Sequence, residues 1–258
     1  MNLRSIAAVG SIFLLAVATP ARSETAEELL AKNLEARGGA DKLSAIHSYV
    51  TKGELRLPGD FKLSYTETRL RLDAGSDACA VRVDASIQGL TDVQVYDGKI
   101  AWHVNPFRGR KDPEQLNSDE ARELADEGSI DGALLAAKTK GSKVEYLGRE
   151  DIDGTQAYKL RVSQTDGTVF TYYLDPDVYL EIKVVEDRTI RGAEHETETN
   201  LGDYERVAGV YFPFSIASGP LNSPDSAKQV ITVESAEANV DVPQSLFALP
   251  GQAIAQSK

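Results

Sequence analysis

Apolar and polar residues alternate along most of this chain, first over residues 49–104 and again over residues 143–238. A period of two predicts β-strands that bury one face, because successive side chains of a strand point to opposite sides. Turn signals such as Asp153-Gly154 divide the second region into short strands. We predict these strands over residues 143–149, 156–163, 168–175, 179–188, 194–206, 210–216 and 229–238.

A helix is predicted before the first strand. Thr25 and Glu28 have the spacing of a capping box, in which each residue satisfies a backbone N–H of the other. Apolar residues then recur on one side of the segment until Gly38-Gly39 ends the helix. A short helical turn over residues 41–45 precedes the first strand.

The alternation is interrupted once, over residues 108–141. This stretch begins with a polar loop that ends at Pro113. Asn117 then starts a second capping-box pattern, which predicts a helix over residues 118–127. A further helix is predicted over residues 131–138.

Short connections between successive strands predict antiparallel neighbours, so the chain is expected to form a meander. We predict a mainly β fold with ten or eleven antiparallel strands in one strongly curved sheet, an incomplete β-barrel. A one-sided sheet leaves apolar surface exposed, so the helices are expected to cover its concave face. Residues 24–250 are expected to form a single domain, although the length also allows two.

One motif is more specific than this general pattern. Asp97-Gly98 supplies a tight turn, the next residues resume the alternation around Trp102, and Asn105-Pro106 ends the strand. Residues 97–107 together resemble the string Asp-Gly-Lys-x-x-Trp-x-x-Asn-Pro-Phe of the LolA family of periplasmic lipoprotein carriers.

The resemblance implies an incomplete barrel with a helical lid over an apolar cavity. Weaker similarity extends over most of residues 25–250 and includes the ending Leu246-Phe247-Ala248-Leu249-Pro250. In the carriers, an arginine of an early Arg-Pro pair holds the lid shut. This chain has no such proline and is longer than a typical carrier, and Arg69 and Arg71 are both candidates for that role.

The two ends of the chain carry their own signals. Arg4, an apolar run over residues 6–17 and the small residues Ala21 and Ser23 predict a signal peptide, residues 1–23, cut after Ser23. Export is therefore expected, and the resemblance to the carriers implies that the destination is the periplasm. No later segment is apolar for the ~18 residues of a membrane helix. Residues 251–258 are expected to be a disordered tail.

The net charge limits the classes of binding partner, and the cysteine content limits the disulfides that can form. The full chain has a formal net charge of −12, and loss of Arg4 and Arg22 with the signal peptide makes it −14. Such a balance argues against a nucleic-acid partner. Cys79 is the only cysteine, so an intrachain disulfide is excluded, and its strand context predicts a buried thiol.

The sequence has few of the residue patterns that are typical of a catalytic site. The three histidines lack the spacing of a metal site, and His103 is expected to be a solvated strand residue. Glu194, Glu196 and Glu198 share one face of a strand without a calcium-binding loop, which favours a solvated outer face. We assign no catalytic residue, metal or cofactor and expect a protein that is not an enzyme.

The stronger signal is a set of apolar rows on neighbouring strands. If these rows all point to the concave side, they either line a wide hollow or fill a solid core, and the sequence does not distinguish between the two. A hollow favours a periplasmic carrier for acyl chains, lipid or lipoproteins, with membrane-bound donor and acceptor proteins; the alternative is an envelope-stress sensor or another protein-interaction module. The residues expected to line the hollow are Trp102, Phe170, Tyr172, Ile182, Phe212 and Phe214.

Overall fold

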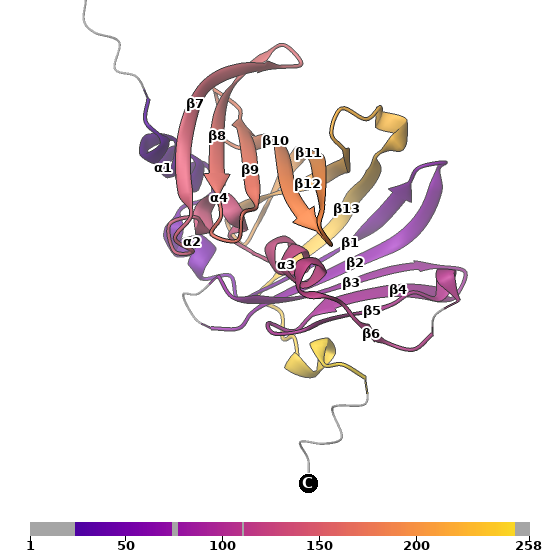
Figure 1. Cartoon of the computed structure of the whole chain (residues 1–258). Coiled ribbons are helices and arrows are strands. Elements are labelled where there is room, and N and C mark those ends of the chain that lie inside the picture. Colours follow the sequence, from indigo (N-terminus) through magenta and orange to yellow (C-terminus); the bar gives the residue numbers. More distant parts are fainter. Residues whose placement is uncertain (1–23, 74–76, 110, 251–258) are drawn as a thin grey trace, which may run out of the picture.

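The computed structural model describes residues 24–73, 77–109 and 111–250, in which thirteen strands form one antiparallel sheet (Figure 1). The order β6-β5-β4-β3-β2-β1-β13-β12-β11-β10-β9-β8-β7 leaves β6 and β7 as edges, so the barrel is incomplete, as predicted. The predicted signal peptide and tail lie outside the described residues. The strands are β1 (Ser48–Leu57), β2 (Phe61–Arg71), β3 (Cys79–Ile87), β4 (Leu90–Tyr96), β5 (Ala101–Val104), β6 (Glu114–Gln115), β7 (Lys143–Ile152), β8 (Thr155–Ser163), β9 (Val169–Leu174), β10 (Glu181–Ile190), β11 (Ala193–Val207), β12 (Val210–Pro220) and β13 (Gln229–Ala238).

The helices lie where the capping signals predicted them. Both capping boxes form, at Thr25 with Glu28 and at Asn117 with Glu120. The helical segments are α1 (Ala26–Arg37), α2 (Ala40–Ser44), α3 (Ser118–Glu127) and α4 (Gly132–Ala136), with 3₁₀ turns η1 (Pro106–Arg108), η2 (Asp225–Ala227) and η3 (Gln244–Phe247).

The number of strands exceeds the ten or eleven predicted, and β6 lies just after the predicted polar loop, where no strand is predicted. Its two residues pair with Trp102 and His103 of β5. Two residues are too few to show a period of two, so only the neighbouring strand decides that this segment is extended. None of the helices in the described ranges is long and apolar enough to cross a bilayer.

The helices α1 and α4 pack on the concave face in one apolar cluster with β8 and β9. The buried positions of α1 are Leu29, Asn33 and Arg37, which are spaced by four residues and so share one face. Asn33 donates to the backbone oxygen of Tyr179 (2.8 Å), so this polar position ties the helix to the sheet. Where α1 ends, a Cβ added to Gly38 would lie 2.4 Å from the carbonyl oxygen of Gly209, so the close approach requires glycine.

The burial of Trp102 is confirmed, but its predicted face is wrong. Ala101 packs with Leu124 of α3 on the concave side, and its neighbour Trp102 therefore points to the opposite face. There Trp102 packs against Phe247 of η3, and its indole Nε1 donates to the Phe247 backbone oxygen (3.1 Å). The C-terminal segment thus covers an apolar patch on the convex side of the sheet.

Candidate functional site

The aromatic residues predicted on β9 lie beneath the helices. Phe170 and Tyr172 are each 7% exposed and belong to a cluster with Leu29 of α1 and Leu134 of α4. In the described conformation, the apolar side chains of the helices occupy the space in front of this strand.

The predicted residues of β12 form a second cluster beside the first. Phe212 stacks on Tyr49 of β1 with ring centroids 4.2 Å apart, and Ile130 lies in the same cluster. Phe214 is two residues further along β12, on the same face, and is also buried. Ile182 differs, because it lies in an irregular step of β10 and is only partly buried.

The helical insertion, residues 118–136, connects one edge of the sheet to the other and is called the lid below. Figure 1 shows α3 and α4 between the two arms of the curved sheet. Because the chain passes from β6 to β7 through this insertion, the lid has to cross the open side of the barrel.

Both candidate arginines of β2 contact the lid near the start of α4. Arg71 Nη2 lies 2.7 Å from Asp131 Oδ1, and its Nε donates to the Ile46 backbone oxygen (3.0 Å). Arg69 donates to the Ser129 backbone oxygen (3.3 Å) and is held by Glu67. The sequence left open which of the two arginines contacts the lid, and in the structure each of them makes its own contact with it.

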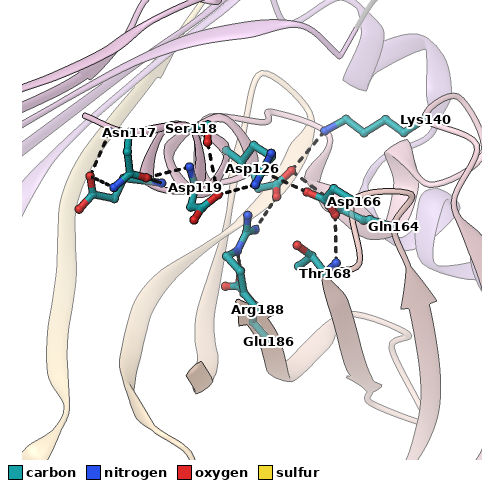
Figure 2. Close-up of polar contacts among 12 residues, drawn as sticks. Asn117, Ser118, Asp119, Asp126, Lys140, Gln164, Asp166, Thr168, Glu186 and Arg188 are labelled. Atoms are coloured by element: carbon teal, nitrogen blue, oxygen red, sulfur yellow. Dashed lines mark hydrogen bonds and ion pairs between the residues drawn. The ribbon is translucent and has the colours of Figure 1, made fainter. Parts of the chain in front are cut away.

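A second set of polar contacts holds α3 against the opposite arm of the sheet (Figure 2). Arg188 of β10 donates to Asp126 (2.5 Å) and also pairs with Glu186 of the same strand. At the other end of α3, Asp119 accepts a bond from the backbone N–H of Arg191 (2.9 Å). The helix α3 is thus held by polar contacts to the arm that contains β10 and by the packing of Leu124 with Ala101 on its other side.

The open space beside α3 is polar. A cavity of about 370 Å³ separates this helix from β4, β5 and η1, and His103 faces it while pairing with Asp92 (2.9 Å). His103 therefore lines a cavity and is hydrogen-bonded to Asp92, so it is not simply solvated as expected. The lining residues are Gln94, His103, Asn105, Arg108, Leu116, Glu120, Glu123, Leu124 and Glu127.

Two carboxyl groups that line this cavity have pKa values above the ordinary value for glutamate. The Glu127 side chain is exposed to solvent at the cavity surface, yet densely packed protein lies around its other sides. This burial and the charges of Glu123, Glu67 and Glu186 raise the pKa of Glu127 to about 8. Burial and the charge of Glu186 also raise the pKa of Glu123.

The row of glutamates on β11 is only partly a solvated face. Glu194 and Glu196 are exposed, whereas Glu198 is buried between Lys183 (2.7 Å) and Lys228 (2.8 Å). Burial opposes ionisation of Glu198, but the bonds from the two lysines outweigh it and lower its pKa to about 2. Across the described ranges, no group of three or more His, Cys, Asp or Glu side chains is placed to hold a metal ion.

Several contacts of the lid had no signal in the sequence. Asp126 and Arg188 are 62 positions apart, and Arg71 and Asp131 are 60 apart. Charged residues on a helix and a strand usually face solvent, so composition and spacing alone did not distinguish these pairs from surface charges. Only the crossing of the lid over the sheet brings them together.

Comparisons with known proteins support the fold. No family model matches the sequence, and no curated protein matches it. Among solved structures, a domain named for outer membrane lipoprotein sorting from Vibrio parahaemolyticus aligns with a TM-score of 0.59 and 14% identity, covering 89% of this chain and 98% of the other.

Two further solved structures align over a similar extent. A DUF1329 family protein from Desulfovibrio piger has a TM-score of 0.61 at 9% identity, covering 88% of this chain and 98% of its own. A LolA superfamily protein from Nitrosomonas europaea has a TM-score of 0.55 at 16% identity, with the same coverage of 88% and 98%. The chain therefore has a LolA-like fold.

Proposed function

We propose that this protein is a periplasmic, non-enzymatic carrier that binds an acyl chain, as lipid or as part of a lipoprotein, beneath the lid. The observation that carries the proposal is that buried aromatic side chains of β9 and β12 face helices that cross the open side of the sheet. A domain of similar fold is named for lipoprotein sorting, which supports the same class of cargo.

The proposed binding surface is the concave face that α1 and α4 now cover. Phe170, Tyr172, Phe212 and Phe214 would line it, with Ile182 at the irregular step of β10. Trp102 is not part of this surface, because it lies under η3 on the convex side. An acyl chain would replace the contacts that lid residues such as Leu134 make in the closed state.

An acyl chain can replace these contacts without a specific polar contact, because each buried CH₂ group contributes about 0.8 kcal/mol. Release then requires the reverse exchange, in which the apolar residues of the lid return to the sheet.

The lid in this proposal opens at its polar contacts. Arg71 and Asp131 hold the start of α4, while Asp126 and Arg188 hold the end of α3. Opening these contacts costs free energy, because the side chains of Arg71 and Arg188 are only 3% and 4% exposed, so the lid stays closed unless cargo binding offsets that cost.

Binding of a fluorescent fatty-acyl probe by the mature protein tests the proposal. We expect saturable binding by the wild type and its loss in Phe212→Asp, because a charge in an apolar space costs several kcal/mol. Glu196→Lys, on the exposed outer face, is the matched control and is expected to bind like the wild type.

A second variant keeps the test meaningful if Phe212→Asp fails to fold. Asp131→Asn weakens the contact with Arg71 but leaves the apolar surface intact, so the probe is expected to load faster. Mass spectrometry of lipid extracted from the exported protein would identify the natural cargo. If no acyl probe binds and no lipid is extracted, the carrier proposal is wrong.

The alternative is a protein-interaction module, of which an envelope-stress sensor is one form. It is favoured by two observations: the concave face is packed in the described conformation, and the cavity beside α3 is polar. A protein that binds no acyl ligand but binds a protein partner through the α3 surface would support this alternative.

A further inference from the structure

One nitrogen of a buried guanidinium has no hydrogen-bond partner. The Arg188 side chain is 4% exposed, its Nε donates to Glu186, and its Nη2 donates to Asp126 (2.5 Å). The third nitrogen, Nη1, is buried and has no acceptor. Among the buried side-chain atoms of the described residues that lack a partner, it is the only nitrogen. A guanidinium donates but never accepts, so only an acceptor atom can satisfy this group.

Arg188 borders the apolar surface beneath the lid. Phe170 lies directly opposite Glu186 in the pairing of β9 and β10, so these two side chains share a face, and Arg188 follows two residues later on that face. The guanidinium carbon of Arg188 lies 6.0 Å from the centre of the Phe170 ring. This distance is at the outer limit of a cation–π contact, and the ring supplies no acceptor oxygen.

Arg188 also borders the polar cavity beside α3. Figure 2 shows its side chain extending from β10 to Asp126 of α3. Glu123 lies one turn before Asp126 on the same side of this helix and lines the cavity. Burial and the charge of Glu186 raise the pKa of Glu123, and the charge of Arg188 opposes them, so the two side chains are near each other. Arg188 therefore lies where the apolar surface meets the polar cavity.

The charged groups around Arg188 are mostly acidic. Arg188 and Lys140 are the basic members of the network that joins β10 to α3, and its acidic members are Asp77, Glu123, Asp126 and Glu186. Beside this network, Arg122 and Asp166 pair with each other (3.6 Å), and His195 on the neighbouring strand β11 is exposed. A further anion would be repelled here, whereas a neutral carbonyl oxygen accepts a hydrogen bond without adding charge.

We propose that Arg188 binds the carbonyl oxygen of a neutral acyl ester or amide, so that the protein selects acylated cargo over ionised fatty acids. This inference rests on the proposed carrier function. When the lid opens, Asp126 moves away with α3 and leaves Nη2 free beside Nη1, while Glu186 on the same strand holds Nε. The carbonyl oxygen accepts from this free side, the acyl chain lies along Phe170, and the rest of the cargo extends into the polar cavity.

Competition against the fluorescent fatty-acyl probe tests this selection. The competitors have one chain length and are a fatty-acid methyl ester, the methyl alkyl ether in which CH₂ replaces the carbonyl, and the ionised fatty acid. We expect the wild type to bind the ester at least fivefold more tightly than the ether and more tightly than the ionised acid.

The variant Arg188→Lys keeps a cation for Asp126 and Glu186 but removes Nη1 and the planar fork. It is expected to bind the ether within twofold of the wild type and to prefer the ester by less than twofold. The matched control is Arg82→Lys. Arg82 also pairs with an acid two residues along its strand, Asp84, but its Nη1 donates to the Leu246 backbone oxygen on the convex side. This control is expected to keep the full preference for the ester.

Infrared spectroscopy of the bound ester observes the hydrogen bond without any substitution. With an isotope label at the carbonyl carbon, the C=O stretch is expected at a lower frequency in the wild-type complex than in hydrocarbon solvent. An unshifted band, an ester preference unchanged in Arg188→Lys, or tighter binding of the ionised acid would overturn the inference. Equal binding of ester and ether by the wild type would refute the role of Arg188 while leaving the carrier function intact, whereas binding of neither would refute both.

Discussion

The guanidinium of Arg188 and the carboxylate of Asp126 form an ion pair that connects the sheet to the lid. Nη2 and Oδ2 are 2.5 Å apart, and the Arg188 side chain is only 4% exposed. Arg188 also pairs with Glu186 and lies 6.0 Å from the ring centre of Phe170. One residue thus contacts the lid, its own strand and the apolar surface beneath the lid.

Replacing Arg188 with alanine should destabilise the protein strongly. The change leaves the carboxylates of Asp126 and Glu186 without their shared cation, and breaking a buried pair costs about 3–5 kcal/mol. Chemical denaturation measures this free energy of unfolding. Lys143→Ala removes an exposed pair with Glu145 and should cost less than about 1 kcal/mol; similar losses in both variants would contradict the role of Arg188.

The raised pKa of Glu127 predicts a stability that falls with rising pH. Its folded pKa is about 8, against an ordinary value of 4.5, so the folded chain binds this proton more tightly than the unfolded chain. The folded state therefore loses stability as pH rises from 4.5 to 8. Thermal unfolding at pH 6 and pH 9 should show a smaller difference for Glu127→Gln than for the wild type, whereas Glu234→Gln, at an exposed position, should behave like the wild type.

The lowered pKa of Glu198 predicts the opposite behaviour in acid. Its stabilising contribution is present above pH 4.5 and is lost as pH falls toward the folded pKa of about 2. Glu198→Gln removes two charge-assisted bonds and should cost about 2 kcal/mol at pH 7. The difference from the wild type should shrink in titrations at pH 2–3, and a constant difference across this range would refute the assignment.

Trp102 should report on the convex side of the sheet and not on the proposed acyl site. Trp102→Ala should cost about 3–5 kcal/mol, because it leaves a cavity between β5 and η3. In the wild type, an acyl ligand should leave the tryptophan emission nearly unchanged, whereas Phe247→Ala should shift it to longer wavelength by admitting water. A large emission change on acyl binding would place the ligand on the convex side instead.

Local patterns in the sequence determined the elements of this fold. Alternation predicted the strands because burial of one face imposes a period of two. The capping boxes at Thr25 and Asn117 predicted where α1 and α3 begin, because unpaired N–H groups at a helix start need nearby acceptors. Short turns predicted antiparallel neighbours, and hence the open meander.

The tertiary structure alone decided which face of each strand is the inner one. A period of two defines two faces but does not tell which is concave, and β5 has buried apolar residues on both. Ala101 faces α3 and Trp102 faces η3, so the C-terminal segment supplied a partner that the pattern of β5 did not reveal.

The contacts of the lid were decided in the same way. The sequence located the helices of the insertion, but the pairs Arg71–Asp131 and Arg188–Asp126 depend on how the lid lies across the sheet. Whether a charged residue faces solvent or a partner depends on what packs over it. The sequence by itself therefore determined the strands and helices, and the packing of distant segments determined which residues hold the lid and which lie beneath it.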